Sequence, residues 1–399
     1  MPIYKLIEKL RGRLDDPSFP EIAEWKASHP GGMAVGYFPV YAPVELIHAA
    51  GMLPVQVAGA MGRIKLDEAD GYLQSFVCSI GRSTMELKLD GHLDNLDAMI
   101  FPSTCEISRG LCGVLRRHDP EKPIIYIHFP QNLESANAKG YLVGELERVK
   151  IALEEMTGKT ITDEAIFKSF EAYNRRWELL RELEEIRYSH PELLSASELY
   201  IIRLAGMNVT VEEHSEILAE AIEALKDTPA HHEVRIRMLL SGAFCERPRI
   251  SMLETIEDEG VAIVADDMLI GQRWWTESLP ASGNPLEILA EYYLKKSVYN
   301  PVVYRPHVTP CESVLRAVEL TGAEGIIISS AKSCHPANHD DQCVITLCEA
   351  QGIPYIRLQY GEDQRLYESI LVQVQALMEA RTRLPFAGTE KSGGEGRED

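Results

Sequence analysis

Three of the eight cysteines stand where a thiol could bind a metal. Cys105 ends the strand-like run AMIFPST before a helical segment, and Cys334 ends GIIISSAKS, with Pro336 suited to the first turn of the next helix. Cys78 precedes Ser79, a residue type that commonly caps helices. Each thiol is therefore expected near a helix N-terminus, where backbone N–H groups and the helix dipole stabilise a thiolate.

The chemistry that such thiolates favour is iron–sulfur or zinc binding rather than magnesium or calcium binding. Three thiolates with no fourth partner nearby suit a 4Fe–4S cluster that keeps one iron without a protein ligand. The alternative is that all three are buried structural cysteines, a common fate of free cysteine. No CxxC pair occurs, so any metal site must be assembled from cysteines distant in sequence. A structural role is favoured for the remaining five, Cys112, Cys245, Cys311, Cys343 and Cys348.

Short apolar runs alternate with longer helical patterns along most of the chain. Several runs are β-branched and continuously apolar, which is typical of parallel strands buried on both faces. The predicted strands are Met33–Val40, Leu53–Val57, Ala98–Phe101, Ile124–His128, Arg235–Leu240, Val261–Val264, Gly325–Ser329 and Tyr355–Leu358.

Between the two halves, Asp163 to Lys226 is predicted to be helical, with breaks near Pro191 and Gly206. The fold class is α/β, with two doubly wound, Rossmann- or flavodoxin-like parallel sheets that face each other across a cleft. The expected divisions are a helical segment at 1–30, a first α/β domain at 31–160, a helical connector at 161–230, a second α/β domain at 231–385 and a disordered tail at 386–399. Ligands of such sheets bind at the carboxyl ends of the strands, where the three cysteines could converge.

Composition excludes several classes of function. The 399 residues are 45% hydrophobic and 25% charged, an ordinary globular composition that suggests two or three domains. Lys plus Arg is 40 against 61 for Asp plus Glu, and a net charge of −21 disfavours nucleic-acid and anionic-membrane partners. No run approaches the roughly 20 apolar residues of a membrane span, and the N-terminus does not resemble a signal peptide. A cytoplasmic protein without a disulfide framework is expected.

The sequence predicts no nucleotide site in this chain. Gly158-Lys159-Thr160 resembles the end of a P-loop, but Leu153 occupies the position of the required earlier glycine. The segment also follows a helix rather than a strand, so it is interpreted as a helix C-terminus capped by Gly158. Neither GxGxxG nor GxSxG occurs. If the reaction consumes a nucleotide, another chain must bind it.

Six motifs occur in order along the chain. They are GYFPVYAPVELIHAAGMLPV at 36–55, FVCSIGRS around Cys78, FPSTCE around Cys105, SGAFCERP at 241–248, DDMLIGQR at 266–273 and SSAKSCHP around Cys334. With these motifs the chain resembles the catalytic subunits of 2-hydroxyacyl-CoA dehydratases and benzoyl-CoA reductases over roughly residues 20 to 385. The opening segment is most similar to the C (gamma) subunits of ATP-dependent benzoyl-CoA reductases.

The resemblance implies that Cys78, Cys105 and Cys334 ligate a 4Fe–4S cluster. It further implies a related cluster-bearing subunit as partner, ATP-hydrolysing electron-activating subunits and a ferredoxin-type electron donor. The implied reaction reduces an aromatic acyl-CoA to a cyclic dienoyl-CoA by single-electron transfers. One departure is His335-Pro336 after the third cysteine, where the family usually has Asp-Pro. The alternatives are a 2-hydroxyacyl-CoA dehydratase subunit, which eliminates water, and a two-lobed binding module without a cluster.

Four further residues are candidates for the reaction. Glu45, in the family-like PVE segment, could act as an acid–base or orient substrate, or could simply stabilise the start of a helix. His307 lies in the polar loop YNPVVYRPHVTP and is a candidate proton donor. Trp274 could stack on an aromatic ring or belong to the core. Arg273 could meet a CoA phosphate or pair with an acidic residue. Asp266 is interpreted as a cap-and-turn residue after a strand.

Overall fold

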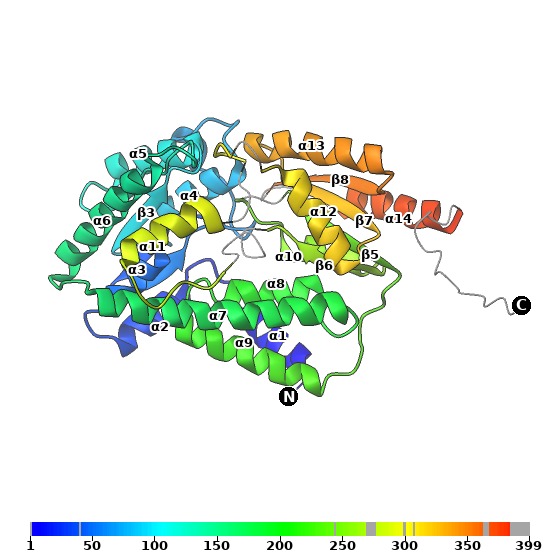
Figure 1. Ribbon diagram of the computed structural model, residues 1–399, viewed down its shortest axis with the longest axis horizontal. Coiled ribbons are helices and arrows are strands. Elements are labelled where there is room, and N and C mark those ends of the chain that lie inside the picture. The colour runs from blue at the N-terminus through cyan, green and yellow to red at the C-terminus, as the bar shows by residue number, and fades with distance from the viewer. Residues whose placement is uncertain are drawn as a thin grey trace, which may run out of the picture.

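The computed structural model describes residues 2–39, 41–242, 245–268, 277–297, 301–305, 308–361 and 367–383. In this part of the chain, eight strands form two parallel sheets, each surrounded by helices. The sheet of the N-terminal half lies beside the sheet of the C-terminal half, and long helices run beneath both (Figure 1). The predicted α/β class with two doubly wound sheets is therefore confirmed.

The first sheet has the strand order β2-β1-β3-β4 with every pairing parallel. Its strands are β1 (Ala34–Tyr37), β2 (Leu53–Gln56), β3 (Ala98–Pro102) and β4 (Ile124–Ile127). Nearly all of their residues are buried, as continuous apolar runs require of strands covered on both faces.

The second sheet repeats this arrangement with the order β6-β5-β7-β8, again parallel throughout. Its strands are β5 (Ile236–Ser241), β6 (Val261–Asp266), β7 (Gly325–Ala331) and β8 (Tyr355–Tyr360). All eight predicted strands are thus present, with ends shifted by no more than a few residues.

Most of the remaining elements surround the two sheets. Around the first sheet lie α3 (Val44–Ala49), η1 (Ala69–Gly71), α4 (Ser79–Leu89), α5 (Glu106–His118), α6 (Ala138–Thr157), α11 (Pro285–Glu291) and η2 (Tyr292–Lys296). Around the second sheet lie α10 (Ile250–Glu257), α12 (Pro310–Thr321), α13 (His335–Gln351) and α14 (Tyr367–Arg383). Gly158 ends α6 in the left-handed conformation, with φ of 66°, which confirms its interpretation as a helix cap rather than part of a phosphate loop.

The helices beneath the sheets form a layer with its own core. They are α1 (Ile3–Leu14), α7 (Asp163–Ser189), α8 (Ala196–Ala205) and α9 (Val211–Lys226), which contribute to that core, and α2 (Pro20–Ser28), whose Ile22 is buried in the core of the first sheet. The side chains of Thr162, Ser195 and Thr210 each accept a backbone N–H at the start of α7, α8 and α9. The predicted breaks near Pro191 and Gly206 are confirmed. No described helix is both long enough and apolar enough to cross a membrane.

The chain that follows β6 returns to the first sheet. Leu279, Leu286, Leu289 and Tyr293 are buried in the same core as β1 to β4, and α11 packs on α6. The core of the first sheet is therefore completed by residues from the second half of the chain. Cys334 contacts this core and also the core of the second sheet.

A buried ionic network joins the helical layer to the second sheet. Asp266, at the end of β6, accepts hydrogen bonds from Arg187 of α7 at 2.8 Å and Arg203 of α8 at 2.9 Å. Arg203 also pairs with Glu184, and the side chains of both arginines and of Asp266 are at most 1% exposed. Burial alone would raise the pKa of Asp266, but the two guanidinium groups lower it. Asp266 is thus a buried counter-ion as well as a turn residue.

The stability of the helical layer should depend on pH through His214. This side chain is fully buried in α9, where Nε2 donates to the carbonyl of Ile202 at 3.1 Å. Burial, and next the positive charge of Arg176, lower the pKa of His214 to about 3 from 6.5. Below pH 6.5 the unfolded chain takes up a proton that the folded chain does not, so stability is lost as the pH falls. Between pH 6.5 and about pH 5 the expected loss is about 2 kcal/mol.

Urea denaturation at a series of pH values measures this loss. His214→Gln keeps an N–H donor for Ile202 without a titrating group, so its stability should fall less steeply over the same range. His190→Gln is the matched control, because His190 is exposed. Parallel profiles for wild type and His214→Gln would contradict the assignment.

Candidate functional site

The three cysteines singled out from the sequence occupy equivalent places in three helices. Cys78 is the N-cap residue of α4, Cys105 of α5 and Cys334 of α13. Each thiol therefore lies at the start of its own helix, beside the first backbone N–H groups.

Both sheets contribute to the site. Cys105 follows β3 and Cys334 follows β7, and each of these strands lies beside the first strand of its sheet, where the strand order reverses. This reversal at the carboxyl ends is where open α/β sheets bind ligands. α4 and α5 belong to the first sheet and α13 to the second (Figure 1).

The groups that shift the pKa of Cys78 include the other two thiols, so the three lie close to one another. Burial raises the pKa of Cys78 most, and the nearby Glu246, Cys105 and Cys334 raise it further. Burial likewise raises the pKa of Cys105, against the effect of backbone N–H groups of Ser108 and Ile107 that donate to its sulfur. Without a cation these thiols are therefore held neutral, and binding of a positively charged group would release protons from them.

Glu246 is a part of the site that sequence reasoning missed. It lies beyond β5, is 3% exposed, and accepts hydrogen bonds from the Ser79 hydroxyl and, at 3.3 Å, from the Ile80 N–H at the start of α4. Tyr360 of β8 donates to its backbone carbonyl at 2.6 Å. Glu246 thus ties the second sheet to the helix that carries Cys78. The sequence signal that could have identified Glu246 is its position in the SGAFCERP motif.

The donor set fits an iron–sulfur cluster better than a single ion. Zinc bound by thiolates at about 2.3 Å draws the sulfurs to within about 4 Å of one another. Among the described residues, the three cysteines do not form a group whose ligand atoms all lie within 4.8 Å. One buried and two half-buried thiols set further apart, each beside helix N–H groups, fit a larger inorganic unit with several irons.

Glu45 lies within the protein, in the first turn of α3, and is fully buried. Burial, and next the Glu45 carboxylate, raise the pKa of Tyr293, and burial raises the pKa of Tyr37 to about 12. Burial raises the pKa of Tyr173 most, and the Glu45 carboxylate raises it further. Glu45 is therefore surrounded by phenol groups that stay protonated, whatever its role.

An aromatic group near Glu45 was also missed from the sequence. Tyr41, Phe129 and Tyr293 have ring centroids 5.1–6.0 Å apart, beyond the carboxyl ends of β1 and β4. Tyr41 has φ of 65°, a left-handed conformation that costs energy for a residue with a side chain. These rings line the same edge of the sheet as Cys105.

The described residues include only some of the remaining sequence candidates. Arg273, Trp274 and His307 lie outside the described residues, as does the expected tail. His335 is exposed in the first turn of α13. Among the remaining cysteines, Cys112 and Cys348 are buried in apolar cores.

Comparison with known proteins gives a consistent family. Residues 39–380 match the family described as 2-hydroxyglutaryl-CoA dehydratase, D-component. The chain is 30% identical to the C subunit of benzoyl-CoA reductase from Thauera aromatica over 374 residues, covering 94% of this chain and 97% of that protein. It is 30% identical to the beta subunit of (R)-2-hydroxyglutaryl-CoA dehydratase of Acidaminococcus fermentans over 386 residues, covering 95% and 99%. The beta subunit of lactoyl-CoA dehydratase of Anaerotignum propionicum is 28% identical over 352 residues, covering 88% and 92%.

Proposed function

This chain belongs to the 2-hydroxyglutaryl-CoA dehydratase D-component family, and we propose that it is the 4Fe–4S-cluster-bearing catalytic subunit of an ATP-dependent benzoyl-CoA reductase-type complex. The complex would reduce an aromatic acyl-CoA to a cyclic dienoyl-CoA by single-electron transfers. Its other components would be a related cluster-bearing subunit, ATP-hydrolysing electron-activating subunits and a ferredoxin-type donor. With these partners the complex would work in the cytoplasm.

The observation that carries the proposal is the meeting of three N-cap thiols from two sheets. Cys78, Cys105 and Cys334 would hold the cluster, and the backbone N–H groups of α4, α5 and α13 would stabilise its negative charge. When bound, a 4Fe–4S cluster with one iron free of protein ligands supplies single electrons and an open position for a substrate atom.

The chain's own residues would exclude water and position protons. Cys78 is buried, and the rings of Tyr41, Phe129 and Tyr293 line the same sheet edge as Cys105, which would keep solvent from a reactive substrate radical. Glu45, held among protonated tyrosines, is the proposed acid–base or substrate-orienting group. Arg273 and Trp274 remain proposed contacts to substrate, and His307 remains a proposed proton donor.

A second function is favoured by the family match. The matching family and two of the relatives above are named as 2-hydroxyacyl-CoA dehydratases, and their identity to this chain is similar to that of the reductase subunit. In a dehydratase the free iron would polarise the substrate oxygen while water is eliminated, without net reduction. The same cysteines would serve both reactions.

Iron and acid-labile sulfide content, with low-temperature EPR, tests the shared part of the proposal. The chain should be purified anaerobically with its native partners. About four irons per copy, beyond those of the partners, are expected for a single 4Fe–4S cluster. A folded chain that stays iron-free after reconstitution would leave a non-catalytic binding module as the better interpretation.

Electron counting then separates the two reactions. Continuous consumption of reductant and ATP with benzoyl-CoA is expected for the reductase. Turnover of a 2-hydroxyacyl-CoA after one priming electron, with no reduction of benzoyl-CoA, would instead assign the chain to a dehydratase.

A further inference from the structure

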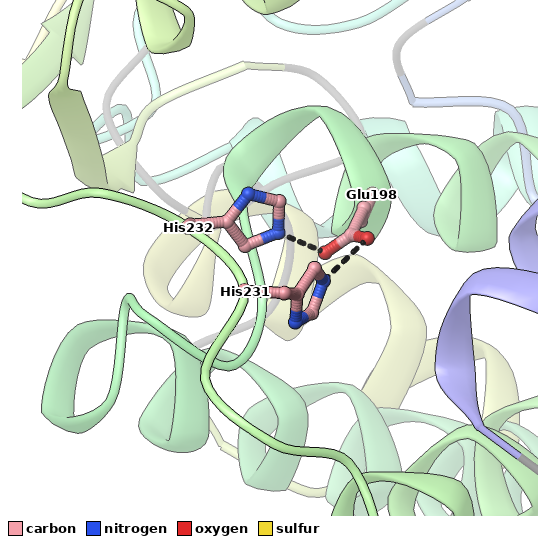
Figure 2. A group of neighbouring side chains, drawn as sticks. All are labelled: Glu198, His231 and His232. Atoms are coloured by element: carbon pink, nitrogen blue, oxygen red, sulfur yellow. Dashed lines mark hydrogen bonds and ion pairs between the residues drawn. The ribbon is translucent and has the colours of Figure 1, made fainter.

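Two consecutive histidines and a glutamate form a compact group away from the cysteines. Figure 2 shows the imidazoles of His231 and His232 both directed at the carboxylate of Glu198. His231 Nε2 lies 3.1 Å from one carboxylate oxygen and His232 Nε2 lies 2.8 Å from the other. One ligand atom from each of the three residues lies within 4.8 Å of the others.

The hydrogen bonds around His231 are not satisfied by a neutral ring. Its Nδ1 lies 3.1 Å from the carbonyl of Pro229, an acceptor, so this nitrogen must carry a proton. In a neutral imidazole Nε2 is then an acceptor, yet it faces a carboxylate oxygen, which is also an acceptor. The contact requires a further proton, on His231 or on Glu198, or a cation between the two atoms.

Cation binding is the alternative to protonation. His232 is satisfied as a neutral ring that donates from Nε2, so protonation would place one charge, on His231, beside a second imidazole whose ring centroid is 4.0 Å away. A single cation bound by both Nε2 atoms and by the carboxylate satisfies all three groups at once. The Nδ1–H bond of His231 to a backbone carbonyl is also the contact that commonly orients a metal-binding histidine.

The surroundings favour a cation and leave space for one. The group lines a cavity of about 510 Å³, which Glu254, Glu257 and Asp258 also line. Arg11 is the arginine among the lining residues, and it is paired with Glu254. Side-chain exposures of 26% and 28% for the histidines keep the site open to solutes.

We propose that Glu198, His231 and His232 bind a divalent first-row transition-metal ion, with the remaining coordination positions open to the cavity. Two imidazoles and a carboxylate suit Zn²⁺ or Fe²⁺ rather than Mg²⁺ or Ca²⁺. The site is independent of the proposed cluster, because it precedes the amino end of β5 whereas the cysteines lie beyond the carboxyl ends of the strands.

The ion would hold the helical layer to the second sheet. Glu198 lies in the first turn of α8, where it also accepts the Ser195 N–H of the capping box at 3.0 Å. His231 and His232 lie in the segment between α9 and β5. A metal bridge between these two segments would fix the point at which the helical layer passes into the second sheet.

Cobalt and zinc titrations of the full chain test the site. Co²⁺ bound by two imidazoles and a carboxylate should give weak visible d–d bands without the strong near-ultraviolet absorption of cobalt–thiolate bonds. Zn²⁺ should displace it stoichiometrically. His231→Ala and His232→Ala should each weaken Zn²⁺ binding by at least about 100-fold, more than loss of an outer partner does.

Two controls decide the outcome. His190→Ala removes a histidine that also pairs with a glutamate, Glu192, but does not belong to the group of three, and should leave affinity unchanged. Cys105→Ser should leave the Co²⁺ d–d bands unchanged. Glu198→Gln, which keeps an acceptor for the Ser195 N–H, should lose binding with circular dichroism unaltered. Thiolate-free Co²⁺ d–d bands that survive both histidine substitutions, or that are lost with Cys105→Ser, overturn the proposal.

Discussion

Cys105→Ser should give a folded chain that binds at least about tenfold less iron than wild type, because metal affinity depends steeply on each ligand. Serine is a better N-cap residue than cysteine, so α5 should start as it does in the wild type. The hydroxyl is too weakly acidic to replace a buried thiolate beside iron. Iron and sulfide content after anaerobic reconstitution, with circular dichroism as the test of folding, measures the effect.

Cys112→Ala is the matched control for that result. Cys112 lies on the same helix, seven residues further along, but is buried in the apolar core. Replacing this thiol by a methyl group should lower the free energy of unfolding by about 1 kcal/mol and leave the iron content unchanged. A full complement of iron in Cys105→Ser, or an equal loss in Cys112→Ala, would refute the assignment of Cys105 as a ligand.

Asp266→Asn should destabilise the chain by about 3–5 kcal/mol, because it leaves Arg187 and Arg203 buried with one carboxylate fewer. Both guanidinium groups donate to the same oxygen of Asp266, and the side chains are almost wholly inaccessible. Asparagine preserves the shape of the site, so the loss of stability measures the effect of the missing charge rather than a change in packing. The midpoint of guanidinium-induced unfolding should fall accordingly.

A second substitution distinguishes charge from general damage. Adding Arg187→Met to Asp266→Asn removes one of the unbalanced charges and should recover part of the lost stability. Glu223→Gln breaks the exposed pair with Lys226 and should leave the midpoint unchanged. If Asp266→Asn unfolds at the wild-type midpoint, the network contributes no net stability.

The elements of this fold could be predicted from the sequence because their signals are local. Continuous β-branched runs such as Gly325–Ser329 are buried on both faces wherever they sit in a parallel sheet. The start of α8 is set by Ser195 and Glu198 within one turn, and α6 ends at Gly158. Such features involve residues only a few positions apart, so a pattern in the sequence suffices.

Contacts between distant residues could not be predicted in the same way. Glu246 meets Ser79 across 167 positions, and Arg187 meets Asp266 across 79. The packing of α11 against the first sheet likewise depends on buried leucines. A leucine in the sequence does not indicate which of the two cores its helix will join. Strand order, the partners of buried charges and the Glu198 group depend on three-dimensional assembly, which alternation and spacing do not encode.

Because Cys334 lies far from Cys78 and Cys105 in the sequence, the ribosome synthesises it much later than the other two cysteines. Cys105 and Cys334 are separated by 229 positions, and the core that contains Cys78 includes residues as late as Ala337. At about 5–20 residues per second, the ribosome takes roughly 10–45 s to travel from Cys105 to Cys334. If the three thiols hold one group, that group can be fully ligated only after Cys334 has been synthesised. Cys78 and Cys105 therefore pass through a period in the nascent chain when they are exposed to oxidants and wrong metals.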